Sequence, residues 1–124
     1  MTDTSAKTVD AQTFGSTMGN AVWLMTMDKA YRDLPIREVE ALVATPILLR
    51  QFKLYSKGKQ PVAFLTWASV SDEVKVKLDA GETLALEDWR SGENLVVVDV
   101  VSPFAEAESL KSKFLAQAAG KPVS

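Results

Sequence analysis

The chain has 124 residues, of which 47% are hydrophobic and 24% charged, and its formal net charge is −2. This length suits one domain, and the acidic balance disfavours nucleic acid as a partner. Neither cysteine nor histidine occurs, which excludes disulfides, thiolate or imidazole metal ligands and every catalytic arrangement built on those two residues. A general base must therefore be a carboxylate, a lysine, a tyrosine or water.

We recognise no transmembrane segment and no secretion signal in the sequence. No apolar run approaches the ~20 residues that span a bilayer, and the first residues lack the apolar core of a secretory signal. With the absence of cysteine, this predicts a cytoplasmic protein without a transmembrane segment.

The first half of the chain is predicted to be helical after a polar start. Residues 1–13 have no hydrophobic period and are expected to form a disordered tail, which leaves 14–124 as a single domain. Apolar residues then recur at helical spacing over 14–28. Pro35 suits the first turn of a second helix, with Ile36, Val39 and Leu42 on its buried side, and Thr45-Pro46 is expected to end that helix.

A hairpin is predicted next, with strands over 50–55 and 61–70 joined by a turn at 56–60. Ser71 is expected to cap a short helix that Gly81 ends. Residues 94–101 (NLVVVDVV) form the most strongly β-prone run, and a last helix is expected over 107–118, before Gly120.

This order of elements predicts an α+β fold, a mostly antiparallel sheet with flanking helices. Three strands make a thin sheet, whose missing edge a partner chain or a loop could cover.

Asp99 is the first candidate for a functional residue. It interrupts a run that is otherwise apolar on both faces, so the strand is predicted to be central and buried on both sides. Alternation would place Leu95, Val97, Asp99 and Val101 on one face. A buried carboxylate costs several kcal/mol unless it is hydrogen-bonded or paired, which makes it a functional candidate. The alternative is a structural Asp that accepts bonds from loop amides or from Arg90.

Three further groups carry weaker signals. Glu87 and Asp88 could form an acid/base pair, although Asp88 is more plausibly a turn cap through the amides of Ser91 or Gly92. A basic group could receive an acidic partner, or its hairpin lysines could keep a sheet edge soluble. The three tryptophans are expected in the core or in a pocket wall. The basic group consists of Arg32, Arg37, Arg50, Lys53, Lys57 and Lys59, with Asp33 among them, and the tryptophans are Trp23, Trp67 and Trp89.

Four stretches in register resemble the lysine acyltransferases that activate RTX toxins. In that family the patterns are an early tryptophan helix, P-V-A-x-x-x-W-A, E-x-W-x-S-G and D-x-x-A-P-F-G. Here they correspond to Ala21–Leu24, Pro61–Ser69, Leu86–Gly92 and Val98–Phe104. The resemblance covers the chain from about residue 19 to about residue 116.

The resemblance implies a variant of the Gcn5-related acetyltransferase fold and a specific reaction. Such enzymes take a fatty acyl group from acyl carrier protein and form an amide with a lysine of a protoxin, so no bound cofactor or metal is expected. Their catalytic pair is a histidine after the first helix and an aspartate on the central strand. The aspartate corresponds to Asp99, and the resemblance extends the pocket to Trp23, Trp67 and Trp89.

The chain departs from the family where the histidine should be. That position falls on Tyr31, and the serine of the same stretch falls on Asp28. A tyrosine of ordinary pKa, near 10, is almost entirely neutral at pH 7 and cannot replace imidazole as a base. The chain also lacks the glycine after Phe104 and the basic, strand-like segment that follows the last helix in the family.

The sequence therefore leaves three hypotheses about function, of which the third is the least specific. The first is transfer of an acyl group from acyl carrier protein to a protein lysine, with Asp99 as base or orienting carboxylate and Tyr31 as hydrogen-bond donor. The second is a non-catalytic relative that binds an acyl chain, acyl carrier protein or another protein, as a homodimer or with a stoichiometric partner. The third is a small α+β module unrelated to acyl transfer.

Overall fold

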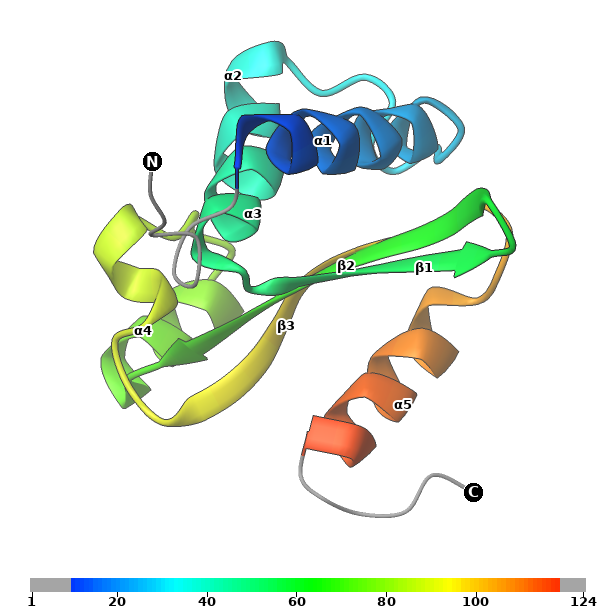
Figure 1. The fold of residues 1–124 in the computed structure, drawn as a ribbon. Helices are drawn as coiled ribbons and strands as arrows, with labels where there is room; N and C mark the ends of the chain where they lie inside the picture. The colour runs from blue at the N-terminus through cyan, green and yellow to red at the C-terminus, as the bar shows by residue number, and fades with distance from the viewer. Residues whose placement is uncertain (1–9, 119–124) are drawn as a thin grey trace.

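A computed structural model describes residues 10–118 of the chain. Its elements follow each other in the order shown in Figure 1. They are α1 (Ala11–Thr26), α2 (Ile36–Val39), the π-helical turn η2 (Glu40–Ala44), α3 (Thr45–Leu49), β1 (Phe52–Lys57), β2 (Gln60–Val70), α4 (Asp72–Asp79), the 3-10 turn η3 (Leu86–Trp89), β3 (Asn94–Val101) and α5 (Ala107–Ala118).

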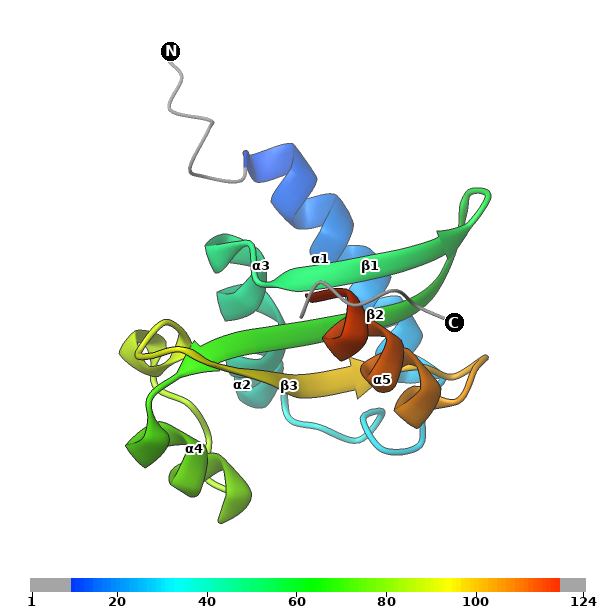
Figure 2. The same cartoon turned by 90° about the horizontal axis from the view of Figure 1, so that it is seen from below.

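The strands form one antiparallel sheet in the order β1-β2-β3. Helices α1 to α3 cover one face, α5 lies on the other, and α4 lies at one end of the sheet (Figures 1 and 2). This confirms the α+β class and the antiparallel sheet with flanking helices. No helix within residues 10–118 is long and apolar enough to cross a membrane.

Helix α1 begins at Ala11, three residues before the predicted start, because Asp10 caps it. The Asp10 carboxylate accepts a hydrogen bond of 2.8 Å from the Thr13 N–H, which satisfies one of the free amides of the first turn. The buried side of α1, which includes Leu24 and Met25, packs with Ile47 of α3 and Phe64 of β2 in the main core.

The second helix does not end at Thr45-Pro46, which corrects the prediction. Proline lacks an N–H, and its ring clashes with the carbonyl four residues earlier in a regular α-helix. The preceding π-helical turn widens the helix at that point, because the Thr45 N–H bonds to the Glu40 carbonyl five residues back. Pro46 then lies in the first turn of α3. Ile36, predicted on the buried side, is instead 87% exposed.

The hairpin is confirmed, with β1 starting two residues later than predicted. Its tight turn uses Gly58, whose φ is +63°, a conformation that glycine adopts without steric cost. Central strand β2 is buried along most of its length. The Ser71 cap of α4 is also confirmed, because its hydroxyl accepts a bond from the Val74 N–H at 3.2 Å.

Strand β3 is an edge strand, and the prediction that it is central was wrong. In the described part of the chain it pairs with β2 alone, and Asn94 to Val100 are half-buried instead of buried. Its apolar composition has another cause: helices cover both faces of the sheet even at its edge (Figure 2).

A β-bulge in β3 also changes the predicted alternation of faces. Thr66 pairs with Asp99 and Trp67 with Val97, so Val98 is an extra residue without its own partner. Val96 and Val98 pack with Ala68 and Trp89, and Val101 packs with Phe64, which lies on the same face of β2 as Ala68. Val97 and Val101 therefore do not share one face, as simple alternation required.

The segment 88–92 holds the end of the sheet together. The Asp88 carboxylate accepts from the Ala85 N–H at 2.9 Å and from Lys77 at 3.4 Å, and these bonds lower its pKa. The structural reading of Asp88 is thus correct, although the predicted partners were wrong. Ser91 donates to the Asp88 carbonyl and accepts from the Ser71 N–H.

Arg90 and Gly92 complete this connection. Arg90 donates to the side chain of buried Gln51 and to the Leu49 carbonyl, and Gln51 donates to the carbonyls of Trp67 and Trp89. Gly92 lies so close to Ser71 that a Cβ there would be 2.5 Å from Ser71 backbone atoms. The segment therefore tolerates no side chain at Gly92.

We expect Gly92→Ala to lower the free energy of unfolding by about 2 kcal/mol, since the new methyl group has to displace backbone. The matched control is Gly19→Ala on the exposed side of α1, where a Cβ meets no atom within 4 Å. This control should raise stability by about 0.5–1 kcal/mol through helix propensity. Urea unfolding of both variants measures the contrast, and equal effects of the two changes would contradict this assignment.

Candidate functional site

The structure brings Tyr31 and Asp99 together across 68 residues of sequence. The Tyr31 hydroxyl donates a hydrogen bond of 3.1 Å to the Asp99 Oδ1. Tyr31 lies in the loop after α1 and Asp99 follows the bulge in β3, so the contact joins the helical layer to the sheet edge. The alternative reading, in which Asp99 pairs with Arg90, finds no support because Arg90 binds Gln51 and Leu49.

Asp28 holds the Tyr31 loop in place. One oxygen of its carboxylate accepts from the Ala30 N–H at 3.0 Å, and the other accepts from the Ser102 N–H, just after β3, at 3.1 Å. Its carbonyl accepts from the N–H groups of Tyr31 and Arg32. The carboxylate thus ties the turn that carries Tyr31 to the strand that carries Asp99.

The electrostatics of the pair follow from its partial burial. Loss of solvent raises the pKa of Asp99 to about 6, and the hydrogen bond from Tyr31 opposes that rise. The pKa of Tyr31 is also raised, first by burial and then by the Asp99 charge. At neutral pH the tyrosine is therefore a neutral donor, and the aspartate is the group that can exchange a proton.

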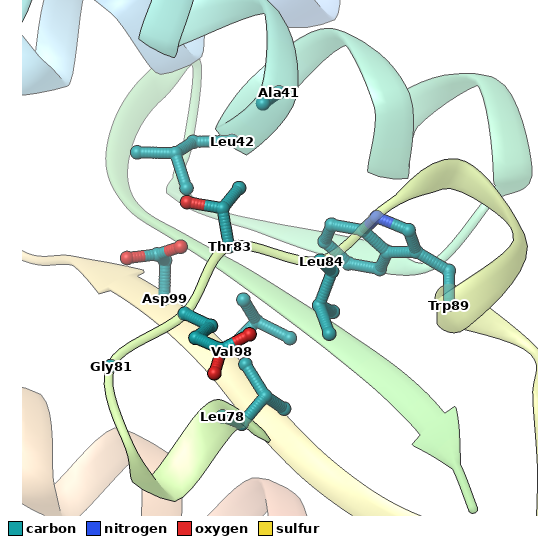
Figure 3. Close-up of a pocket in the computed structure, with 10 residues that line it drawn as sticks. Ala41, Leu42, Leu78, Gly81, Thr83, Leu84, Trp89, Val98 and Asp99 are labelled. Atoms are coloured by element: carbon teal, nitrogen blue, oxygen red, sulfur yellow. The ribbon is translucent and has the colours of Figure 1, made fainter. Parts of the chain in front are cut away.

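Asp99 lines a pocket of about 250 Å³ that we call the Trp89 pocket. In Figure 3, Asp99, Thr83 and Leu42 lie toward one end of this pocket and Trp89 lies toward the other. Ligand pockets usually measure about 300–1,000 Å³, so this one suits a side chain or a few methylene groups. Its walls are Ala41, Leu42, Leu78, Gly81, Glu82, Thr83, Leu84, Trp89, Val98 and Asp99.

A buried hydroxyl lies on the strand beside Asp99. Thr66 is fully buried, and its Oγ1 has no hydrogen-bond partner. Thr66 is directly opposite Asp99 in the β2–β3 pairing, where side chains project from the same face about 5 Å apart.

Of the three tryptophans, Trp89 lines the pocket beside Asp99 and the other two lie apart from it. Trp23 is 42% exposed and contacts Phe104, with ring centroids 6.4 Å apart. Trp67 contacts Phe114 of α5, at 6.2 Å. The substrate-pocket role expected of Trp23 and Trp67 stays a prediction.

The chain matches the model of the RTX toxin acyltransferase family over residues 10–121. It belongs to this family. The protein-lysine myristoyltransferase RtxC of Kingella kingae is 29% identical over 93 residues, which cover 74% of this chain and 56% of that protein. The protein-lysine myristoyltransferase HlyC of Escherichia coli is 30% identical over 94 residues, 75% of this chain and 54% of that protein.

An uncharacterized protein of Synechocystis, sll0720, is 28% identical over 96 residues, 75% of this chain and 65% of that protein. The chain thus spans a little more than half the length of the two myristoyltransferases. The match to the family spans residues 10–121, which include the whole described fold and both Tyr31 and Asp99.

Sequence reasoning missed two residues of this site. Asp28 was recognised only as a departure from a serine, and Thr66 was passed over as one position of a strand. An Asp at the end of a predicted helix, three residues before a candidate site residue, is a signal that could have suggested a loop clamp. Nothing in the sequence indicated the pairing of Thr66 with Asp99, since it depends on the bulge.

Within residues 10–118, no cluster of carboxylates could hold a metal ion.

The raised pKa of Asp99 predicts a pH dependence of stability. A carboxyl group whose pKa rises on folding, from 3.8 to about 6, stabilises the folded state below pH 4 and loses that contribution as the pH rises through 6. The free energy of unfolding should fall by about 3 kcal/mol from this group over that range. Chemical denaturation at several pH values measures it, and Asp99→Asn should remove this component alone.

The Asp28 clamp predicts a coupled effect on Asp99. Asp28→Asn removes an acceptor for Ala30 or Ser102, so the Tyr31 hydroxyl should lose its position and the pKa of Asp99 should rise above about 6. Carboxyl NMR titration measures this shift. In a Tyr31→Phe background the same change should have no further effect, because the bond is already absent. Asp33→Asn, an exposed acid of the same loop, is the control, and a rise in either the control or the double variant would contradict the clamp.

Proposed function

We propose that this protein transfers an acyl group to a lysine of a target protein, with Asp99 as the base and acyl carrier protein as the acyl donor. The observation that carries the proposal is the contact between Tyr31 and Asp99 beside the Trp89 pocket. Membership in the RTX toxin acyltransferase family and the names of the two lysine myristoyltransferases support it.

The reaction joins the target amine to the acyl carbon and releases a thiol. The lysine nitrogen attacks the thioester carbonyl and forms the C–N bond, and the C–S bond then breaks. Asp99 takes a proton from the attacking nitrogen, and the departing thiolate gains one proton, so an amide and a free thiol result. A base with a pKa of about 6 is well matched to this step near neutral pH, because it is mostly ionised and still holds a transferred proton.

Tyr31 contributes a hydrogen bond and no base. Its hydroxyl is neutral and donates to Asp99 in this structure. That bond favours the ionised carboxylate and fixes its orientation. The size of the Trp89 pocket suits the end of a lysine side chain or of an acyl chain, and the remainder would lie along the surface.

A specific observation favours a second candidate, a non-catalytic relative that binds the same partners. Imidazole can accept a proton near pH 7, whereas the pKa of Tyr31 is shifted further from that range. If catalysis in the family requires two groups that exchange protons, this chain retains one. The site would then hold a target lysine through Asp99 without reacting.

Mass spectrometry of a lysine-bearing protein, incubated with acyl carrier protein loaded with a fatty acid, distinguishes the two. We expect an amide adduct that Asp99→Asn reduces by at least about 100-fold, the usual contribution of a general base. Tyr31→Phe should reduce the rate less, by roughly tenfold, since it removes one hydrogen bond.

The variant Tyr31→His restores the imidazole and tests whether acyl-transfer activity increases. A modest increase over the natural protein agrees with an active enzyme. Product from Tyr31→His alone, with none from the natural protein, would identify a non-catalytic relative. An adduct that forms equally with Asp99→Asn would refute Asp99 as the base.

A further inference from the structure

Within residues 10–118, no strand pairs with the outer edge of β3. Among residues 10–118, β2 on its inner side is the one strand that pairs with β3. The half-exposure of Asn94 to Val100 reflects that open edge. Tyr31 lies at its end, where its hydroxyl donates to Asp99.

The two edges of this sheet differ in how they are protected. Strand β1 carries Lys53 and Lys57, and edge lysines discourage pairing with foreign strands. Strand β3 has no lysine, and its one charge, Asp99, lies beyond the bulge. The segment from Leu95 to Val98 is thus the less protected edge, with strongly β-forming residues.

Pockets accompany this edge on both faces of the sheet. The Trp89 pocket lies between β3, η2 and the loop after α4. A second pocket, of about 210 Å³, lies between β3, Tyr31 and α5, and Asp99 lines both. A third, of about 260 Å³, continues along Val96 to Val98 between α4 and α5. Alternate side chains of an added strand would enter pockets on opposite faces.

The charges around Asp99 favour a cationic side chain. Glu82 shares the Trp89 pocket with Asp99, and Glu108 shares the second pocket with Asp99 and Lys111. Of the charged side chains that line these two pockets, three are carboxylates and one is a lysine. The third pocket is mixed, with Lys75, Lys111 and Asp79, so the acidic character is confined to the Asp99 end.

We propose that the β3 edge binds an extended, lysine-bearing segment of a target protein as a fourth strand, with the lysine directed at Asp99 between Glu82 and Glu108. Main-chain pairing along Leu95 to Val98 supplies affinity that does not depend on sequence, and the bulge ends the pairing where the lysine has to turn inward. The proposal rests on the proposed function for the identity of the lysine as the acceptor, and the binding mode can be tested without acyl transfer.

The probe is a nine-residue, end-blocked peptide of alternating valine and threonine with one central lysine, titrated into the full chain labelled with nitrogen-15. We expect the amide signals of Leu95 to Val100 to shift. Replacing the lysine by norleucine should weaken binding about tenfold. N-methylation of one alternate set of peptide amides should abolish binding, and methylation of the other set should leave it nearly unchanged, because a paired strand bonds through one side only.

Matched variants test the carboxylates. Glu82→Gln with Glu108→Gln should weaken the lysine peptide several-fold and leave the norleucine peptide unchanged. Glu73→Gln with Glu106→Gln removes the same charge from exposed positions on and beside the two helices and should have no effect. Shifts confined to β1, equal losses in both double variants, or indifference to N-methylation would overturn the proposal.

A second copy of the chain on this edge would also overturn it. Sedimentation at increasing concentration would then reveal a dimer, and the β3 signals would shift without peptide. The peptide titration contains no acyl donor, so an absence of peptide binding would refute this binding mode without deciding whether the protein transfers acyl groups. Peptide binding without any adduct in the acyl-transfer assay would in turn separate recognition from catalysis.

Discussion

The placement of one carboxylate in a strand of valines constrains the whole site. Partial burial raises the pKa of Asp99 to about 6, so the ionised form needs a hydrogen-bond donor nearby. Tyr31 is that donor, and it reaches Asp99 because Asp28 ties its loop to the residue after β3. The bulge at Val98 keeps Asp99 opposite buried Thr66 while the valines beside it still pack under the helices. The local irregularity of the strand and the position of the first loop therefore depend on each other.

Most of the fold could be predicted because its signals are local. Ser71 caps α4 through its own side chain, Gly58 makes the hairpin turn, and apolar spacing reveals α1. The errors lie where a residue depends on distant partners. An apolar strand indicates cover on both faces and says nothing of its place in the sheet, so β3 was misplaced at the centre. Pro46 was expected to end a helix because the widened turn before it has no signature in sequence.

The site residues also divide into those with a local signal in the sequence and those that depend on distant partners. Asp99 could be found from its chemistry alone, since a carboxylate among valines is costly anywhere. Tyr31 was found only through the resemblance to the acyltransferases, because 68 residues separate it from Asp99 and nothing local connects them. Thr66 escaped both approaches: a threonine in a strand is ordinary, and its isolation becomes visible only when its hydroxyl is seen to lack a partner.

Tyr31, which we expect at the position of the family's histidine, contacts Asp99, and its chemistry determines which group holds the proton. An imidazole beside a carboxylate shares its titration near neutral pH, with the carboxylate as the stronger acid. Beside Asp99, a tyrosine whose pKa is raised stays protonated, so the carboxylate is the one member of the pair that titrates near pH 6. In the proposed reaction, the strength of Asp99 as a base would therefore depend on its burial. Any target strand that covers the open β3 edge would exclude more water and raise that pKa further. If both proposals hold, binding of the acceptor strand would raise the strength of the base through the same edge.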